Sequence, residues 1–317
     1  MAKKKVKGIE KEFSPLVYGT GTRACAGEDV GLAIHTLDLA WESGFCVFDT
    51  ANSYGKAEEN LGKWLIHSGH RNEVALLDKG CNPGQKGSED VFNAATIQKQ
   101  LALSLDRLQT ESVEMYILHR DDITKPVDEI VEMLNEVKAK GLIQKFGGSN
   151  WTLTRIQEAN KYAKQHGLEG FTVCSPNFCL ADLEWDPWGS SVTLSRDFAY
   201  QKWLKEIQMP VFNYSSLARG YLSGTFNPDG NKAIEDCISP VPIEEYDSSE
   251  NRERLRRAWQ LSEKKGCSIS QLCLAWVLCQ DMNMFPIVSP GSKEHMTDNM
   301  GALDVKLSRE EITWLHQ

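Results

Sequence analysis

The chain has 317 residues, a formal net charge of -9 at pH 7 and an isoelectric point of about 5.4. Its 41% hydrophobic and 25% charged residues are typical of a globular protein with a sizeable buried core. The acidic balance disfavours binding to phosphate backbones or anionic lipid surfaces, so we expect neither a nucleic-acid nor a membrane partner.

The cysteines and the N-terminal residues indicate the cellular compartment and whether a metal is expected. Nine cysteines are scattered singly without a CxxC pair, which favours free thiols and predicts a cytoplasmic protein. No group of His and Cys has zinc-site spacing, so we expect no metal. The N-terminal residues, MAKKKVKGIEKEF, are basic but precede no apolar run, so we expect no signal peptide.

Predicted strands alternate with amphipathic helices along the chain. A short hairpin is expected at 5–13, and a first strand at 16–19 runs into the glycine-rich loop GTGTRACAG. A helix is expected at 28–43, where apolar residues recur three and four positions apart. The pattern then predicts strands at 46–49, 74–79, 113–118, 143–147, 171–174, 211–214 and 285–288, and helices at about 57–67, 91–107, 127–140 and 152–166.

This alternation indicates βαβ units and a parallel sheet. Because no Pro-, Gly- or Ser-rich linker divides the chain, we expect a single domain over residues 1–317, an α/β fold of the (β/α)8 TIM-barrel type. Segments 177–197 and 224–249 exceed ordinary loop lengths. We expect both long loops to lie over the C-terminal mouth of the barrel and to set substrate specificity.

Residues able to carry chemistry follow three of the predicted strands. Asp49 ends the second strand and Tyr54 lies in the loop behind it, while Lys79 ends the third strand and His119 follows the fourth. In a parallel barrel the C-terminal ends of all strands face the same way. We therefore expect these four side chains to meet at one mouth.

Five ordered motifs resemble those of the aldo-keto reductase superfamily: FDTANSYG, LLDKG, YILHRDD, FGGSNW and NYSSLARGYLSG. The resemblance runs from about Leu16 to the C-terminus. It implies that the chain reduces an aldehyde or ketone with a hydride from a nicotinamide cofactor. In that role Tyr54 would supply the proton, Lys79 would lower the pKa of its phenol, Asp49 would hold the lysine and His119 would orient the carbonyl.

The resemblance also implies a set of cofactor contacts. Ser149 and Asn150 correspond to the pair that binds the nicotinamide amide; they could also cap the following helix, and the two roles are compatible. Ser175 stands where the family usually has glutamine, and Tyr214 corresponds to the aromatic residue that stacks on the nicotinamide. The expected contacts of the pyrophosphate and adenosine are Ser215, Leu217, Arg219, Gly220, Ser292, Lys293 and Asn299.

Two departures from the family pattern concern charge. The adenosine segment offers Lys293 beside Ser292 and His295, but Gly291 stands where an arginine is expected. A cation in this segment would form a charge-assisted hydrogen bond with the 2′-phosphate of NADP(H), so the segment favours NADP(H) over NAD(H). Asp78 stands directly before Lys79, where the family usually has a small or hydroxyl residue. The alternation of side chains along a strand predicts that Asp78 points into the helix layer. A nearby cation is its candidate partner.

A sugar-derived carbonyl is one candidate substrate, because Trp151, Trp185 and Trp188 could stack on sugar rings at the mouth. Alternatively, these tryptophans pack the loops themselves. Two other functions stay open: a non-catalytic nucleotide-sensing partner subunit with the same barrel, and a lyase or isomerase with Lys79 as a Schiff-base lysine. The oligomeric state and the direction of the reaction are left open.

Overall fold

The computed structural model describes residues 3–83 and 92–317. Its backbone divides into two compact units, Ala2–Ser175 and Pro176–Gln317, called here the N-terminal and the C-terminal unit. Six parallel strands belong to the N-terminal unit, whereas helices dominate the C-terminal unit. The single domain over residues 1–317 stays a prediction.

The N-terminal unit contains a hairpin and a parallel sheet. β1 (Lys4–Lys5) pairs antiparallel with β2 (Glu12–Phe13), which confirms the predicted hairpin. The parallel strands, each paired with the next, are β3 (Val17–Gly19), β4 (Val47–Asp49), β5 (Ala75–Gly80), β6 (Val113–Leu118), β7 (Ile143–Ser149) and β8 (Val173–Ser175). β5 and β6 are buried along their whole length, which explains why both are so apolar.

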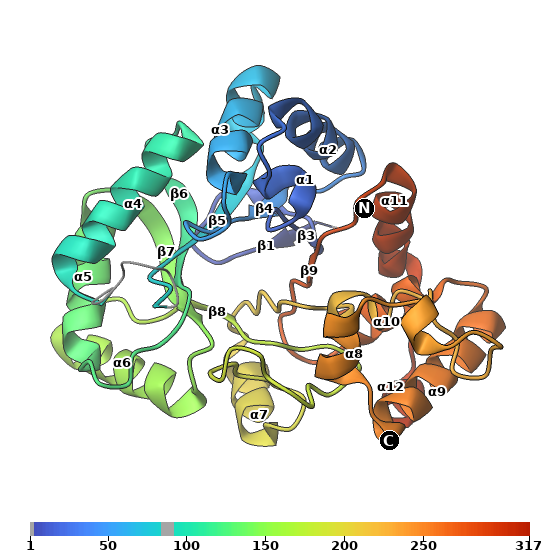
Figure 1. The fold of residues 1–317 in the computed structure, drawn as a ribbon. Coiled ribbons are helices and arrows are strands. Elements are labelled where there is room, and N and C mark those ends of the chain that lie inside the picture. The colour runs from blue at the N-terminus through green and yellow to red at the C-terminus, as the bar shows by residue number, and fades with distance from the viewer. Residues whose placement is uncertain (1–2, 84–91) are drawn as a thin grey trace. The chain divides into compact units, whose positions relative to one another are not determined.

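Helices cover the outer side of this sheet (Figure 1). They are α1 (Arg23–Ala26), α2 (Val30–Glu42), α3 (Ala57–Ser68), the 3-10 turn η1 (His70–Asn72), α4 (Ala94–Leu108), α5 (Val127–Ala139) and α6 (Leu153–His166). The five long helices confirm the predicted ones, except that residue 91, the predicted start of the third, lies outside the described residues. The glycine-rich run was expected to be loop, yet α1 forms there because the Thr22 side chain accepts the backbone N–H of Cys25.

A buried carboxylate fixes the hairpin to the N-terminal ends of the strands. Glu114, near the start of β6, is 2% exposed and pairs with Lys11 at 2.7 Å and Arg71 at 3.1 Å. Its other oxygen accepts the backbone N–H of Leu76 in β5 at 2.8 Å. The hairpin therefore packs at the end of the sheet opposite to the predicted catalytic residues.

The C-terminal unit is built around a buried helix. Its elements are α7 (Phe198–Ile207), η2 (Ala218–Gly220), η3 (Ile234–Asp236), α8 (Pro240–Tyr246), α9 (Ser249–Lys265), α10 (Ile269–Leu278), β9 (Ile287–Val288), α11 (Lys293–Gly301), η4 (Ala302–Asp304) and α12 (Arg309–His316). Eight of the ten residues of α10 are buried, and it packs against α9, α11 and η4. β9 falls within the strand predicted at 285–288.

The strand predicted at 211–214 is wrong as a regular strand. The segment forms only isolated parallel bridges, Val211 with Met284 and Tyr214 with Asn177. Asn213 donates to the backbone oxygen of Phe178 at 2.7 Å and to the Ser216 hydroxyl at 2.9 Å. The backbone N–H of Val211 donates to Asn283, and the oxygens of Val211 and Asn213 accept from Phe285 and Ile287, so the segment pairs with 283–287 without forming a continuous strand.

The two long loops differ from each other. The prediction that residues 224–249 form a loop is wrong, because η3 and α8 lie within them. Pro240 occupies the first turn of α8, where a backbone N–H would have no partner within the helix. Residues 177–197 hold no helix in the described structure. The placement of both segments over a barrel mouth stays a prediction.

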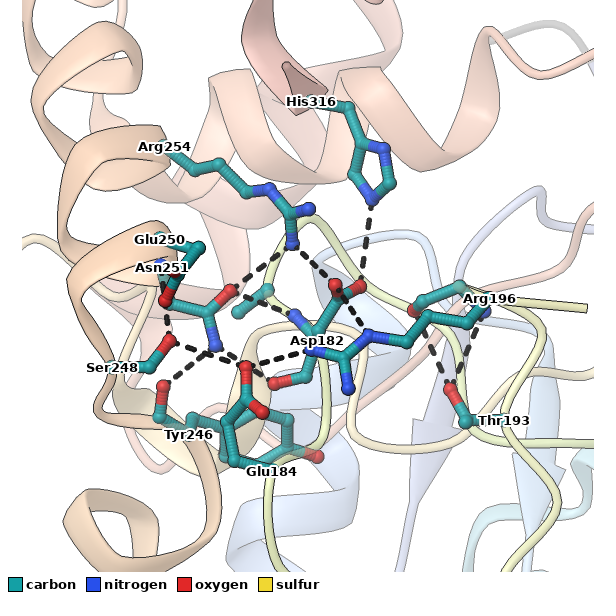
Figure 2. A network of polar contacts seen from close by, with 12 residues as sticks. Asp182, Glu184, Thr193, Arg196, Tyr246, Ser248, Glu250, Asn251, Arg254 and His316 are labelled. Atoms are coloured by element: carbon teal, nitrogen blue, oxygen red, sulfur yellow. Dashed lines mark hydrogen bonds and ion pairs between the residues drawn. The ribbon is translucent and has the colours of Figure 1, made fainter.

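A polar network holds the 177–197 loop within the C-terminal unit (Figure 2). The carboxylate of Asp182, on this loop, accepts from Arg196 and Arg254, each at 3.0 Å, and lies 3.6 Å from His316 Nε2. The backbone of Asp182 bonds in both directions with the Asn251 side chain, at 2.8 and 2.9 Å. The loop is therefore fixed to α9 and α12 by buried polar contacts.

No helix within residues 3–83 and 92–317 has the length and apolar character needed to span a bilayer.

A close approach of α3 to α4 makes Gly62 sensitive to substitution. A Cβ at Gly62 would lie 2.2 Å from the backbone oxygen of Arg107, which cannot move without α4. Gly62→Ala should lower the free energy of unfolding by about 3 kcal/mol, measured by urea denaturation. The matched Gly31→Ala, at an exposed site in α2, should be neutral or slightly stabilising; equal losses for both would contradict this packing.

Candidate active site

An ion pair is buried at the C-terminal ends of β4 and β5. Asp49 is the last residue of β4, and Lys79 precedes the last residue of β5, the neighbouring strand. The Lys79 ammonium donates to Asp49 Oδ1 and to the backbone oxygen of Thr50, and both side chains are almost fully buried. Each buried charge needs the other, because a single unpaired ion at this depth would be strongly destabilising.

Tyr54 lies beside this pair. The Lys79 Nζ is 5.0 Å from the centroid of the Tyr54 ring, and the ring packs edge-on against His119 with centroids 5.6 Å apart. The glycine-rich loop makes room for the ring, because a Cβ at Gly21 would lie 3.1 Å from Tyr54 Cδ2. The four residues predicted from separate motifs are thus neighbours within the N-terminal unit.

Two contacts fix His119. Its backbone N–H donates to the oxygen of Gly80 at the end of β5, at 2.8 Å. Its Nδ1 lies 3.4 Å from the Ser53 hydroxyl, in the loop that carries Tyr54. Nothing in FDTANSYG distinguishes Ser53 from an ordinary turn serine, so the sequence did not identify this contact.

The pKa shifts in the site follow from burial opposed by charge. Burial acts to lower the pKa of Lys79, but the charges of Asp49 and Tyr54 outweigh it and the pKa is raised. For Tyr54 burial is the larger effect, so its pKa is raised above 10.0 although Lys79 acts to lower it. The predicted effect of Lys79 is therefore present but does not dominate. At neutral pH Tyr54 carries its proton and Lys79 its charge.

Asp78 points into the helix layer, as strand alternation predicted, but not toward a cation. Its fully buried carboxyl faces the carboxyl of Glu58 on α3. The nearby cation Arg107 donates to Glu58 instead, at 2.9 Å. The expected cation partner of Asp78 is therefore wrong, because α3 presents a carboxyl at that position.

The residues expected at the nicotinamide amide gather beside His119. Ser149 donates to the backbone oxygen of Ser175 at 2.8 Å, and the Asn150 amide donates to the Ser149 hydroxyl at 3.1 Å and to the backbone oxygen of His119 at 3.4 Å. The buried Ser175 hydroxyl has no hydrogen-bond partner in the described part of the chain. The predicted capping role is wrong, because Thr152 caps α6.

The pyrophosphate residues predicted in the C-terminal unit form a tightly wound segment. Ser215, Ala218, Arg219 and Gly220 all have left-handed backbones, with φ of 53°, 48°, 53° and 105°. Non-glycine residues adopt this conformation rarely, and such strain clusters at binding sites. Tyr214 precedes the segment and Leu217 lies within it.

Arg219 has partners inside the C-terminal unit. Its guanidinium pairs with the buried carboxylate of Glu245 at 2.8 Å and lies 5.4 Å from the ring centroid of Trp188. It thus joins the left-handed segment to α8 and to the 177–197 loop. Its contact with a cofactor stays a prediction.

The adenosine residues cluster on α11. Ser292 caps this helix by accepting the backbone N–H of His295 at 3.3 Å. Lys293 is exposed in the first turn, whereas Asn299 is 4% exposed. A cation at the N-terminal end of a helix suits a phosphate.

The three tryptophans considered for sugar stacking differ in exposure. Trp151 is 1% exposed, donates to the backbone oxygen of Arg120 at 3.0 Å and packs against Phe171 with centroids 4.7 Å apart. Trp151 is therefore a packing residue, and the prediction that it stacks on a sugar ring is wrong. Trp185 and Trp188 are half-exposed.

Arg155 on α6 is a positioning residue that the sequence did not single out. It donates twice to Asp121, at 2.9 and 3.1 Å, and to the backbone oxygens of Asp122 and Lys125. These bonds hold the loop that follows His119. Among the described residues no group of three or more His, Cys, Asp or Glu side chains could hold a metal, and the nine cysteines are free thiols.

A sequence model of the Aldo/keto reductase family matches residues 15–317, and the chain belongs to this family. Members of the family are oxidoreductases that act on carbonyl groups and use nicotinamide cofactors, generally NADPH.

Curated relatives and a solved structure agree with this assignment. The chain is 28% identical to aldo-keto reductase str7 of Strobilurus tenacellus, over 87% of this chain and 77% of the relative. It is 26% identical to norsolorinic acid reductase B of Dothistroma septosporum, over 93% and 74%. The thermostable aldo-keto reductase Tm1743, solved in complex with the inhibitor epalrestat, has a TM-score of 0.75 and 21% identity over 100% of this chain and 99% of that one, which supports the α/β-barrel fold.

The neutral state of His119 predicts a pH dependence of stability. Burial, then the charges of Lys79 and Arg120, hold its pKa well below 6.5. Below pH 6.5 the His119 ring binds a proton in the unfolded chain but not in the folded chain. The free energy of unfolding therefore decreases as the pH falls, by up to about 1.4 kcal/mol per pH unit. His119→Gln should therefore shrink the difference in unfolding free energy between about pH 7.5 and 5.0 by about 2 kcal/mol, measured by urea denaturation.

The exposed His67 provides the control for this measurement. His67→Gln should leave the difference between the two pH values unchanged. A full difference in the His119 variant would mean that this ring is protonated in the folded protein.

Proposed function

We propose that this chain is an NAD(P)H-dependent reductase of aldehydes or ketones in which Tyr54 donates the proton. The observation that supports this most is the meeting of Asp49, Tyr54, Lys79 and His119 at the ends of neighbouring strands. A bound nicotinamide would supply the hydride that is transferred to the carbonyl carbon. The complete set of four argues against a non-catalytic nucleotide-sensing subunit.

Burial and charge give Tyr54 the properties of a general acid. Its raised pKa keeps the phenol protonated before the reaction. When the proton moves to the carbonyl oxygen, the Lys79 ammonium stabilises the phenolate that remains, and Asp49 holds Lys79 in place. The charge of Lys79 thus favours the transition state more than the resting state.

His119 contributes orientation without charge. Its lowered pKa leaves the ring neutral at pH 7, so one ring nitrogen carries a proton and can donate to the carbonyl oxygen. Ser53 at Nδ1 fixes the ring plane. A neutral donor at this position also avoids a second cation beside Lys79.

The residues of the N-terminal unit fit a nicotinamide amide. Ser149, Asn150 and Ser175 offer hydroxyl and amide groups side by side, and the unpartnered Ser175 hydroxyl requires a hydrogen-bond partner. A ligand amide would provide one. We assign the stacking contact to Tyr214.

The remaining contacts are proposed in the C-terminal unit. We assign the pyrophosphate to Ser215, Leu217, Arg219 and Gly220, since strained left-handed backbones cluster at binding sites and Arg219 brings a cation. We assign the adenosine end to Ser292, Lys293 and Asn299, with NADP(H) preferred over NAD(H) because of the exposed cation at the start of α11.

Replacing the proton donor should separate catalysis from binding. Tyr54→Phe should lower the turnover number for carbonyl reduction at least ~100-fold and leave the dissociation constant of NADPH nearly unchanged, because only the acid is removed. Turnover is followed by NADPH absorbance with a panel of sugar aldehydes, simple ketones and norsolorinic acid. Tyr162→Phe removes a solvent-facing phenol on α6 and should behave as wild type. Near-full activity of Tyr54→Phe would mean that another group donates the proton.

The cofactor preference has its own test. Lys293→Ala should weaken NADPH binding about 10-fold and leave NADH binding unchanged, because only NADPH carries the 2′-phosphate. Quenching of tryptophan fluorescence measures both affinities. Lys232→Ala, at an exposed position of the same unit, should change neither. An equal loss for both cofactors after Lys293→Ala would show that Lys293 does not contact the phosphate.

A further inference from the structure

Behind Lys79 lies a cluster of buried polar groups that carbonyl reduction does not use. Asp78, the residue before Lys79 in β5, turns its side chain away from the catalytic residues and toward α3 and α4. Tyr116 is its register partner on β6, so both side chains lie on the same face of the sheet. Asp78 and Tyr116 are 0% exposed and Glu58 is 1% exposed.

Hydrogen-bond donors for the two carboxyls are too few. Within the described residues, neither oxygen of Asp78 has a donor, and Oε1 of Glu58 has none. Arg107 donates only to the other oxygen, Oε2 of Glu58, at 2.9 Å. Two ionised carboxylates face to face would be two acceptors with nothing between them, which buried polar groups almost never are.

A single proton resolves this arrangement. We propose that Asp78 and Glu58 share one proton, which keeps Asp78 neutral and leaves Asp49 as the one carboxylate that acts on Lys79. Arg107 balances the remaining negative charge of the pair. Asp78 is then a positioning residue that acts through Lys79, a role that rests on the proposed function of Lys79 and Tyr54.

The groups around the pair support a neutral Asp78. Burial, then the adjacent Glu58, raises the pKa of Asp78 well above its usual range, although Lys79 acts to lower it. Burial also keeps Tyr116 neutral, with Cys81 beside its hydroxyl. The groups that face Asp78 are thus Glu58 from α3, with Arg107 behind it, and Tyr116 from β6, while Lys79 acts on it from the opposite face of β5.

A charged Asp78 would change the catalytic site. A second carboxylate next to Lys79 would disfavour the phenolate of Tyr54 and raise the pKa of its phenol further. Proton sharing removes that penalty without removing the side chain. The departure from a small or hydroxyl residue at this position is therefore compatible with an active site.

Infrared spectroscopy of the whole protein tests the shared proton directly. Above neutral pH the wild type should show the carbonyl stretch of one protonated carboxylic acid, and Asp78→Asn should lose it, because the remaining carboxylate of Glu58 is paired with Arg107. Glu59→Gln, which removes a partly exposed carboxylate from the same helix, should keep it. Survival of the band in Asp78→Asn, or its absence from the wild type, would overturn the proposal.

The pH profile of turnover tests the link to Lys79. Asp78→Asn should leave the pKa of the alkaline limb in place, because the carboxyl that it replaces is already neutral in the wild type. A downward shift in Asp78→Asn would show that Asp78 is charged in the wild type. If no carbonyl is reduced, the proposed function fails while the infrared result still decides the proton.

Discussion

The buried ion pair of Lys79 and Asp49 is the constraint around which the N-terminal unit is arranged. An ammonium at this depth needs its counter-charge fixed, and the neighbouring strands β4 and β5 fix it by their register. The same strand ends place Tyr54 and His119, because the loop after β4 and the start of the loop after β6 both bond to the backbone of β5. One pair of strands thereby sets the geometry of four side chains.

Charge is distributed so that Lys79 acts on Tyr54. His119 is neutral, Asp49 is the direct carboxylate partner, and the carboxyl of Asp78 lies on the opposite face of β5 beside Glu58. Burial alone would make Tyr54 a poor acid, since its phenolate would be desolvated. In the proposed reaction the ammonium would offset that cost when the phenolate forms, which would let a buried site use a phenol near neutral pH.

Much of the N-terminal unit was predictable, since its helices and strands have clear apolar periods and caps. The four catalytic candidates were predictable because each follows a recognisable strand. The rest depends on tertiary partners that no local pattern reveals. The Asn213 side chain bonds to the backbone of Phe178, and the Arg219 guanidinium pairs with Glu245 and lies beside Trp188, 26 and 31 positions away. Likewise, only the packing of α3 on β5 shows that Asp78 faces a carboxyl.

The most direct measurement of the central claim is the pKa of Tyr54 itself, followed by NMR in protein carrying ¹³C-labelled tyrosine. The resonance of Tyr54 is identified by its loss in the phenylalanine variant. Lys79→Met should raise this pKa well above the wild-type value, because the ammonium is the main group that stabilises the phenolate. An unchanged or lower pKa in the Lys79 variant would contradict the claim, and would show that Lys79 does not control the acidity of Tyr54.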